Sequence, residues 1–160
     1  MILAAPHKNI LLSDDSQNKI LRDSFADDYP LNILVAEDDF VNQKLIGRIL
    51  FKLGYQADIL SDGIHVTESL KKKNYNVILM DVRMPFMDGY ETTQAIRKMA
   101  VKQPYIIAMT ANAMSQDRDE CLQIGMNDYI AKPMHLPEII KTLKIAAAYV
   151  IEKNNIMLAN

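Results

Sequence analysis

Short apolar runs alternate with longer amphipathic stretches from residue 32 onward, and this alternation limits the folds that the chain can adopt. Apolar runs of this length are typical of strands that are covered on both faces of a sheet. Strands joined through helices need right-handed crossovers, so they form a parallel sheet with helices on both sides. We therefore predict an α/β fold, a doubly wound five-stranded parallel sheet with five helices. The predicted strands are 33–36, 56–60, 77–80, 106–109 and 128–131, and the predicted helices are 41–53, 63–73, 89–99, 115–124 and 137–153.

The first predicted helix has an apolar stripe in which residues recur every four positions, with a second series beside it, and Gly54 follows as a helix terminator. We expect this stripe to face the sheet. It consists of Val41, Leu45, Ile46, Ile49, Leu50 and Leu53.

Residues 1–30 differ in character from the rest of the chain. They combine polar and turn-forming residues with isolated apolar clusters whose helical period is weak. We predict a linker or appended segment at 1–30, one globular domain at 31–153 and a C-terminal tail at 154–160. The apolar residues from Ile156 to Leu158 would be exposed on a monomer, which predicts a homodimer contact or a docking surface, with passive surface as the alternative.

Composition excludes several classes of protein. A net charge of −2 without a stripe of Lys and Arg argues against a nucleic-acid surface. The single Cys121 rules out an internal disulfide framework and is expected to be a small apolar helix residue rather than a redox group. No apolar stretch approaches the ~20 residues that span a bilayer, and the opening residues are too short for a secretory signal. We predict that the chain is cytoplasmic, whether or not a parent protein is anchored in a membrane.

Carboxylates follow two of the predicted strands. Glu37 and Asp38 come after the first strand and Asp81 after the third, and these strands are neighbours in the flavodoxin-like order 2-1-3-4-5. Like charges ~4 Å apart repel by ~4 kcal/mol at an effective dielectric of 20, so such a cluster needs a hard cation or a retained proton. Capping of a helix N-terminus is the alternative for Asp38 or Asp39 alone, but no helix directly follows Asp81. The pattern predicts a Mg²⁺ site.

A hydroxyl and an ammonium follow the remaining strands of the predicted sheet. Thr110 ends the fourth apolar run, and Lys132 follows the fifth. The carboxyl ends of parallel strands meet at one edge, where open α/β sheets place their chemistry. Three carboxylates, a hydroxyl and an ammonium are the parts of a site that binds a divalent cation and accepts a phosphoryl group.

Four segments in this order resemble the receiver domain of two-component response regulators. They are 33–38 (ILVAED), 80–89 (MDVRMPFMDG), 109–111 (MTA) and 129–133 (YIAKP). The resemblance covers about residues 32–147. The stretch from Tyr29 to Leu45 is similar to receivers fused behind the kinase cores of hybrid sensor histidine kinases.

The resemblance implies a role for each residue that matches a family motif. Asp81 would be the phosphoacceptor, and a histidine kinase or a histidine phosphotransfer protein would be the phosphodonor. The metal ligands would be Glu37, Asp38, Asp81 and the backbone carbonyl of Arg83. Thr110 and Lys132 would bond the phosphoryl oxygens, and Tyr129 would be a mobile aromatic side chain coupled to Thr110. The Lys132-Pro133 peptide bond would be cis. Asp39 departs from the amide that related receivers often carry there.

Two other functions stay open from the sequence. A receiver-like interaction module that accepts no phosphate would be favoured by loss of Asp81 or Lys132, and both are present. A phosphohydrolase with an aspartate nucleophile would need a second acid two residues further on, where this chain has Arg83. We expect the chain to catalyse its own phosphorylation and dephosphorylation, without turnover of an independent substrate.

Overall fold

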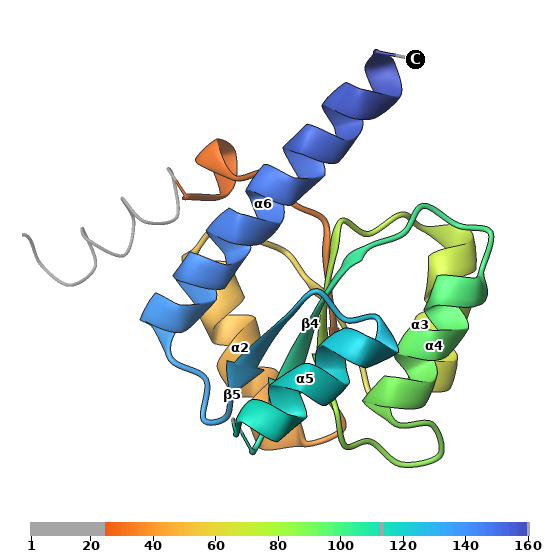
Figure 1. Ribbon diagram of the computed structural model, residues 1–160. Helices are drawn as coiled ribbons and strands as arrows, with labels where there is room; N and C mark the ends of the chain where they lie inside the picture. Colours follow the sequence, from red (N-terminus) through yellow and green to blue (C-terminus); the bar gives the residue numbers. More distant parts are fainter. Residues whose placement is uncertain (1–24, 113, 160) are drawn as a thin grey trace, which may run out of the picture.

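A computed structural model describes residues 25–112 and 114–159. Within them, strands and helices alternate in the predicted order (Figure 1). The strands are β1 (Ile33–Ala36), β2 (Asp58–Leu60), β3 (Val77–Asp81), β4 (Tyr105–Thr110) and β5 (Asp128–Ala131). The helices are α2 (Phe40–Lys52), α3 (Gly63–Lys72), α4 (Gly89–Lys98), α5 (Ser115–Ile124) and α6 (Leu136–Leu158).

All five strands are parallel and lie in the order β2-β1-β3-β4-β5, which confirms the predicted topology. β1 and β3 are hydrogen-bonded neighbours, with Ala36 opposite Met80. β3 in turn pairs with β4, and Asp81 lies opposite Met109. The residues that end these central strands therefore lie side by side at one edge of the sheet.

Successive strand residues point to opposite faces, so the sheet has two apolar layers. In β1, Val35 packs on one side with Ile46 of α2 and Leu143 of α6. Leu34 packs on the other side with Val66 of α3, in the layer that also contains buried residues of α4 and α5. Cys121 belongs to this second layer and is buried, as expected for a small apolar residue. Figure 1 shows α2 and α6 on one face of the sheet and α3 and α4 on the other.

The apolar stripe predicted for α2 is wrong at its N-terminal end. Ile46 and Leu50 are buried, but Val41 is 72% exposed and Leu45 is 38% exposed. The sequence contains two overlapping four-residue series. Ile46 and Leu50 of one series are buried, whereas in the other series only the C-terminal members, Ile49 and Leu53, pack into the core. Two apolar side chains are therefore left in solvent near the edge where β1 ends.

Residues 25–31 pack against the domain instead of leading away from it. Residues 25–28 are helical, and the Phe25 side chain is buried in the core. Its ring lies 4.9 Å from that of Tyr29 and edge-on to that of Tyr55 at 6.1 Å. The Tyr55 hydroxyl donates to the Tyr29 carbonyl at 2.5 Å. The packed structure thus begins before the predicted boundary at residue 31, while residues 1–24 lie outside the described part of the chain.

Helix α6 continues beyond the predicted end near residue 153 and takes in most of the predicted tail. Its first half buries Ile139, Leu143 and Ala146 against the sheet. Beyond the sheet its apolar side chains are exposed, including Ile156 at 58% and Leu158 at 86%, as the sequence predicted for a monomer. None of the helices within residues 25–112 and 114–159 has the length and apolar character to cross a membrane.

Substituting Gly89 by alanine is expected to destabilise the fold strongly. A Cβ atom there would lie 2.2 Å from the Asp81 carbonyl oxygen and 2.9 Å from the Val82 Cα. Both are backbone atoms, so the start of α4 would have to move away from β3. We expect the free energy of unfolding to fall by about 3 kcal/mol in urea denaturation.

The matched control is Gly47→Ala in α2, where the new Cβ would meet only the end of the Ile59 side chain, at 3.3 Å. Alanine favours a helix interior over glycine by roughly 0.5–1 kcal/mol, so this variant should be no less stable than the parent chain. Equal destabilisation of the two variants would contradict the close approach of α4 to β3.

Candidate functional site

Three carboxylates converge where β1 and β3 end. Glu37 and Asp38 directly follow β1, and Asp81 is the last residue of β3. One oxygen from each of these groups lies within 4.8 Å of the others. Glu37 and Asp81 are buried and Asp38 is exposed, so the cluster opens to solvent on one side. The structure thus brings together the three acidic residues that the sequence predicted to converge.

Glu37 is held in place by its own loop. Its Oε1 accepts a hydrogen bond from the backbone N–H of Asp39 at 3.0 Å. Its backbone carbonyl accepts from Nε2 of Gln43 at 2.6 Å. Glu37 Oε2 lies 2.8 Å from Nζ of Lys132, and apart from this ion pair no donor reaches that buried oxygen among the described residues. The Glu37 carboxylate is therefore held in one position, and the Lys132 ammonium is the cation that offsets its charge.

Lys132 reaches the cluster from the far side of β4. Its Nζ lies 2.8 Å from Glu37 and 3.0 Å from Asp81, and only 18% of its side chain is exposed. The Lys132 backbone N–H donates to the carbonyl of Thr110 at 2.7 Å, which fixes the start of the side chain. The Lys132-Pro133 peptide bond is cis, as predicted. One ammonium therefore bridges two buried carboxylates.

Burial raises the pKa of Asp81 to about 6, and the nearby Glu37 carboxylate adds to the rise. Lys132 and the Arg83 backbone N–H, which donates to Asp81 Oδ1 at 3.1 Å, oppose it. Burial alone lowers the pKa of Lys132, but its bonds to Glu37 and Asp81 raise the pKa overall. Three carboxylates facing one ammonium therefore leave an excess of negative charge.

Thr110 lies in the same cleft as Asp81 and Lys132. Its side chain is buried, and its Oγ1 accepts from the Asn112 backbone N–H at 3.1 Å. The hydroxyl also donates to the Asn112 carbonyl at 3.3 Å. Both bonds are to the adjacent loop, so the hydroxyl can exchange them for an anion in the cleft.

Tyr129 is the predicted residue that the structure does not bring into this cleft. It pairs with Ala108, two residues before Thr110, and lines a separate groove between α5 and α6. The guanidinium of Arg118 lies 5.7 Å from the centre of its ring. Coupling between Tyr129 and Thr110 stays a prediction.

Asp39 caps helix α2 and takes no part in the acidic cluster. Its side chain accepts from the backbone N–H of Asn42 at 2.9 Å, which confirms the capping alternative for this residue. Glu37 is also supported by Asn42 and Gln43, which were not predicted as site residues from the sequence. The sequence feature that could have predicted these contacts is the presence of polar side chains in the first turn of the helix, just after the acidic pair.

The oxygen donors of this site suit Mg²⁺. Mg²⁺ prefers a few hard oxygen ligands and keeps water or phosphate in its remaining positions. A dication would add positive charge beside the buried Glu37 and Asp81 carboxylates, and it would oppose the burial and the Glu37 charge that raise the pKa of Asp81. The cluster therefore could bind a divalent metal.

The metal-free chain should lose stability as pH rises from about 4 to about 6. The folded chain holds the Asp81 proton up to a pKa of about 6, against the ordinary value of 3.8. Because the folded state binds this proton more tightly than the unfolded state, the free energy of unfolding falls across that window. Asp81→Asn cannot titrate, so it should exceed the parent chain in stability above pH 6 by on the order of 1–3 kcal/mol.

Urea denaturation at a series of pH values with a chelator present measures this difference. Subtracting the pH curve of Asp81→Asn removes the contribution of the other titrating groups to the free energy of unfolding. One of these is Asp58, whose lowered pKa acts in the opposite direction. A difference that stays constant between pH 4 and pH 7 would contradict the burial of an uncompensated charge at Asp81.

Comparison with known proteins gives consistent matches to one domain type. The family model described as the response regulator receiver domain matches residues 33–144. The sensor histidine kinase RcsC of Escherichia coli K12 is 35% identical over 157 residues, which cover 91% of this chain and 16% of RcsC. Hybrid signal transduction histidine kinase B of Dictyostelium discoideum is 39% identical over 120 residues, which cover 68% of this chain and 6% of that protein. The chain thus spans only a small part of these curated relatives.

Solved structures give the same match. The receiver domain of the sensor histidine kinase PA1611 of Pseudomonas aeruginosa, solved with a magnesium ion coordinated in its active site cleft, is 43% identical with a TM-score of 0.67. The match covers 74% of this chain and 98% of that domain. A co-crystal structure of the Saccharomyces cerevisiae histidine phosphotransfer protein Ypd1 with the receiver domain of Ssk1 matches with 26% identity and a TM-score of 0.68, over 74% of this chain and 89% of the matched chain.

Proposed function

The chain belongs to the response regulator receiver domain family, and we propose that it accepts a phosphoryl group from a phosphohistidine onto Asp81 in a two-component phosphorelay. The two curated relatives described above are histidine kinases of which the chain matches a small part. We therefore propose that it is the receiver of a hybrid sensor histidine kinase, placed at the C-terminal end of that protein. Its phosphodonor is the kinase itself or a histidine phosphotransfer protein.

The observation that carries this proposal is the placement of Asp81. Its carboxylate ends a central strand, lies within 4.8 Å of Glu37 and Asp38, and lies 3.0 Å from the Lys132 ammonium. A buried carboxylate with cation ligands on one side and a lysine on the other is arranged to receive a phosphoryl group. A role in stability alone would not require three carboxylates at one point.

Transfer proceeds by in-line attack of an Asp81 oxygen on phosphorus. The P–N bond to the donor histidine breaks, and its electron pair returns to the imidazole nitrogen. A weak nucleophile suffices because the transition state is loose, so catalysis consists of alignment and neutralisation of the equatorial oxygens. Mg²⁺ would be held by Glu37, Asp38, Asp81 and the Arg83 carbonyl, and it would supply positive charge that neutralises the phosphoryl group.

Lys132 and Thr110 serve the other phosphoryl oxygens. Lys132 exchanges its bond to Asp81 for a bond to the phosphoryl group, because the acyl phosphate removes the charge from that carboxylate. Thr110 exchanges its bonds to the Asn112 backbone for one to a phosphoryl oxygen. Its movement leaves room beside β5, which Tyr129 fills by turning inward from its groove between α5 and α6. This repacking is the output of the switch.

Exposed apolar side chains near the edge where β1, β3 and β4 end form the docking surface for the donor. Phe40 and Val41, at the start of α2, are 65% and 72% exposed. Phe86, after β3, is 91% exposed with a positive φ of 67°, and Met114, after β4, is 68% exposed. A non-glycine residue with positive φ and a fully exposed ring is costly for an isolated domain. We propose that a helix carrying the donor histidine covers these side chains.

Incubation with acetyl phosphate and Mg²⁺ tests the proposal. We expect the intact mass to increase by one phosphoryl group, and the increase to disappear with a chelator or in Asp38→Ala, which removes a metal ligand. Persistence of Mg²⁺-dependent labelling in Asp38→Ala would show that the metal lies elsewhere. Absence of labelling in the parent chain would favour an interaction module, and steady release of phosphate from a phosphomonoester would favour a hydrolase.

A further inference from the structure

The cleft that contains Asp81 has a second, outer set of carboxylates. The cleft has a volume of about 940 Å³, and Asp88, Asp117 and Glu120 line it outside the acidic cluster. Arg83 is the cation that lines the cleft beside them. With a dication bound by the inner cluster, that ion and Lys132 would balance the charge of the three inner carboxylates. The outer set therefore leaves the mouth of the cleft negative.

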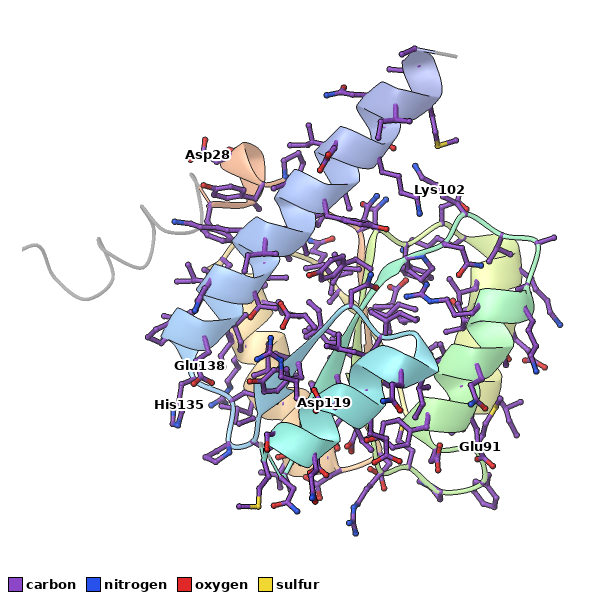
Figure 2. All side chains as sticks on the ribbon, viewed as in Figure 1. Asp28, Glu91, Lys102, Asp119, His135 and Glu138 are labelled. Carbon is purple, nitrogen blue, oxygen red and sulfur yellow. The ribbon has the colours of Figure 1, made fainter. Side chains whose placement is uncertain are left out.

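The outer carboxylates lie on α5 and directly before the start of α4. Asp117 and Glu120 are one helical turn apart on α5, so they lie on the same face. Asp88 caps α4 and accepts from the backbone N–H of Glu91 at 2.8 Å; Figure 2 labels Glu91 at the start of that helix. None of the three outer carboxylates forms an ion pair within residues 25–112 and 114–159.

The field of these groups acts on another residue that lines the cleft. Tyr90, on α4, also lines it. Burial raises the pKa of the Tyr90 phenol, its contact with Cys121 adds to this, and the charges of Glu120 and Asp117 raise it further. A charge that acts on Tyr90 also acts on an anion entering the same cleft.

Every phosphodonor brings negative charge into this cleft. A small anionic donor meets repulsion from the three outer carboxylates, and the single charge of Arg83 offsets only part of it. A donor whose reactive histidine is flanked by lysine or arginine is attracted instead, since complementary charge raises the rate of productive encounter.

We propose that Asp88, Asp117 and Glu120 form a charge filter that selects phosphodonors with basic side chains beside the phosphohistidine and disfavours acidic or small anionic donors. This inference rests on the proposed function, because it concerns access to the same Asp81. It identifies the partner by the chemistry of its contact surface.

Two phosphohistidine peptides of equal length test the filter, one with lysines flanking the histidine and one with glutamates. The quantity measured is the ratio of the two rates at which Asp81 is phosphorylated at low ionic strength. We expect the parent chain to favour the lysine peptide by about tenfold, and Asp117→Asn/Glu120→Gln to reduce that preference by about threefold or more. Asp88 is left intact because it caps α4.

The matched control is Glu68→Gln/Glu152→Gln, which changes the net charge equally at exposed positions of α3 and α6 outside the cleft. It should keep the parent ratio, and about 0.5 M salt should reduce the ratio in all three proteins. Equal ratios in the cleft variant and the parent chain would overturn the filter. Phosphorylation of the chain by acetyl phosphate but by neither peptide would also overturn the filter. Failure of every donor, acetyl phosphate included, would instead reject the proposed function.

Discussion

Asp81→Asn is expected to abolish phosphorylation by acetyl phosphate, with the rate falling by at least about a thousandfold. The amide is neutral, so it is a far weaker nucleophile than the carboxylate, and the substitution removes one of the three carboxylates of the acidic cluster. The fold should persist, because the amide fills the same volume beside Lys132 and relieves the repulsion from Glu37. Intact mass after incubation with acetyl phosphate and Mg²⁺ is the readout.

Asp62→Asn is the control for this substitution. Asp62 caps α3 and accepts from the backbone N–H of His65 at 2.9 Å, a role that asparagine fills equally well. This variant should be phosphorylated like the parent chain. A phosphoryl group still found on Asp81→Asn would place the acceptor elsewhere, and peptide mapping would show whether Asp38 had taken it.

Lys132→Met should have two separate effects. Its ammonium is the cation that pairs with Glu37, whose side chain is fully buried, and with Asp81, whose side chain is 6% exposed. Removing one partner of a buried ion pair leaves uncompensated charge, so the metal-free chain should lose about 3 kcal/mol of unfolding free energy at neutral pH. The rate of phosphorylation should fall by about a hundredfold, because in the proposed mechanism one phosphoryl oxygen would lose its cation.

Lys73→Met tests whether these effects come from burial. Lys73 forms an equally short ion pair, 2.7 Å from Asp58, but 53% and 45% of the two side chains are exposed. Exposed pairs add little to stability, so this variant should unfold and become phosphorylated like the parent chain. Added Mg²⁺ should restore much of the stability that Lys132→Met loses. Similar behaviour of the two lysine variants would show that the buried pair carries no special role.

The acidic cluster could be predicted because strand ends are visible in the sequence. Each apolar run stops at a polar residue, and parallel pairing places the ends of β1 and β3 side by side. Glu37, Asp38 and Asp81 therefore had to meet once the strand order was right. The same reasoning placed Thr110 and Lys132 at this edge, but not the bridge from Lys132 to both Glu37 and Asp81, which depends on side-chain conformation.

Helix faces were harder to predict than strand ends. Two overlapping apolar series in α2 are equally good helical stripes, and only the position of the sheet selects Ile46 and Leu50 over Val41 and Leu45. The packing of Phe25 could not be predicted either, because its partners, Tyr29 and Tyr55, belong to segments with no helical or strand period.

The outer carboxylates show a further limit of prediction from sequence. Asp88 and Asp117 lie on different helices, and nothing in their local patterns relates one helix to the other. Their shared position beside Tyr90 follows from the packing of α4 and α5 on the sheet. Surface charge of this kind is ordinary in a sequence and acquires meaning only from the cleft that it borders.

The route by which Lys132 reaches the carboxylates has a consequence for signalling. Nearly a hundred residues separate it from Glu37 along the chain, and both must be in place around Asp81 before the acceptor is complete. A nascent or half-assembled polypeptide holds the aspartate without its distant counter-ion. On the proposed function, phosphorylation of Asp81 is therefore fastest in chains that have completed the fold, so the relay would favour mature copies over half-assembled ones.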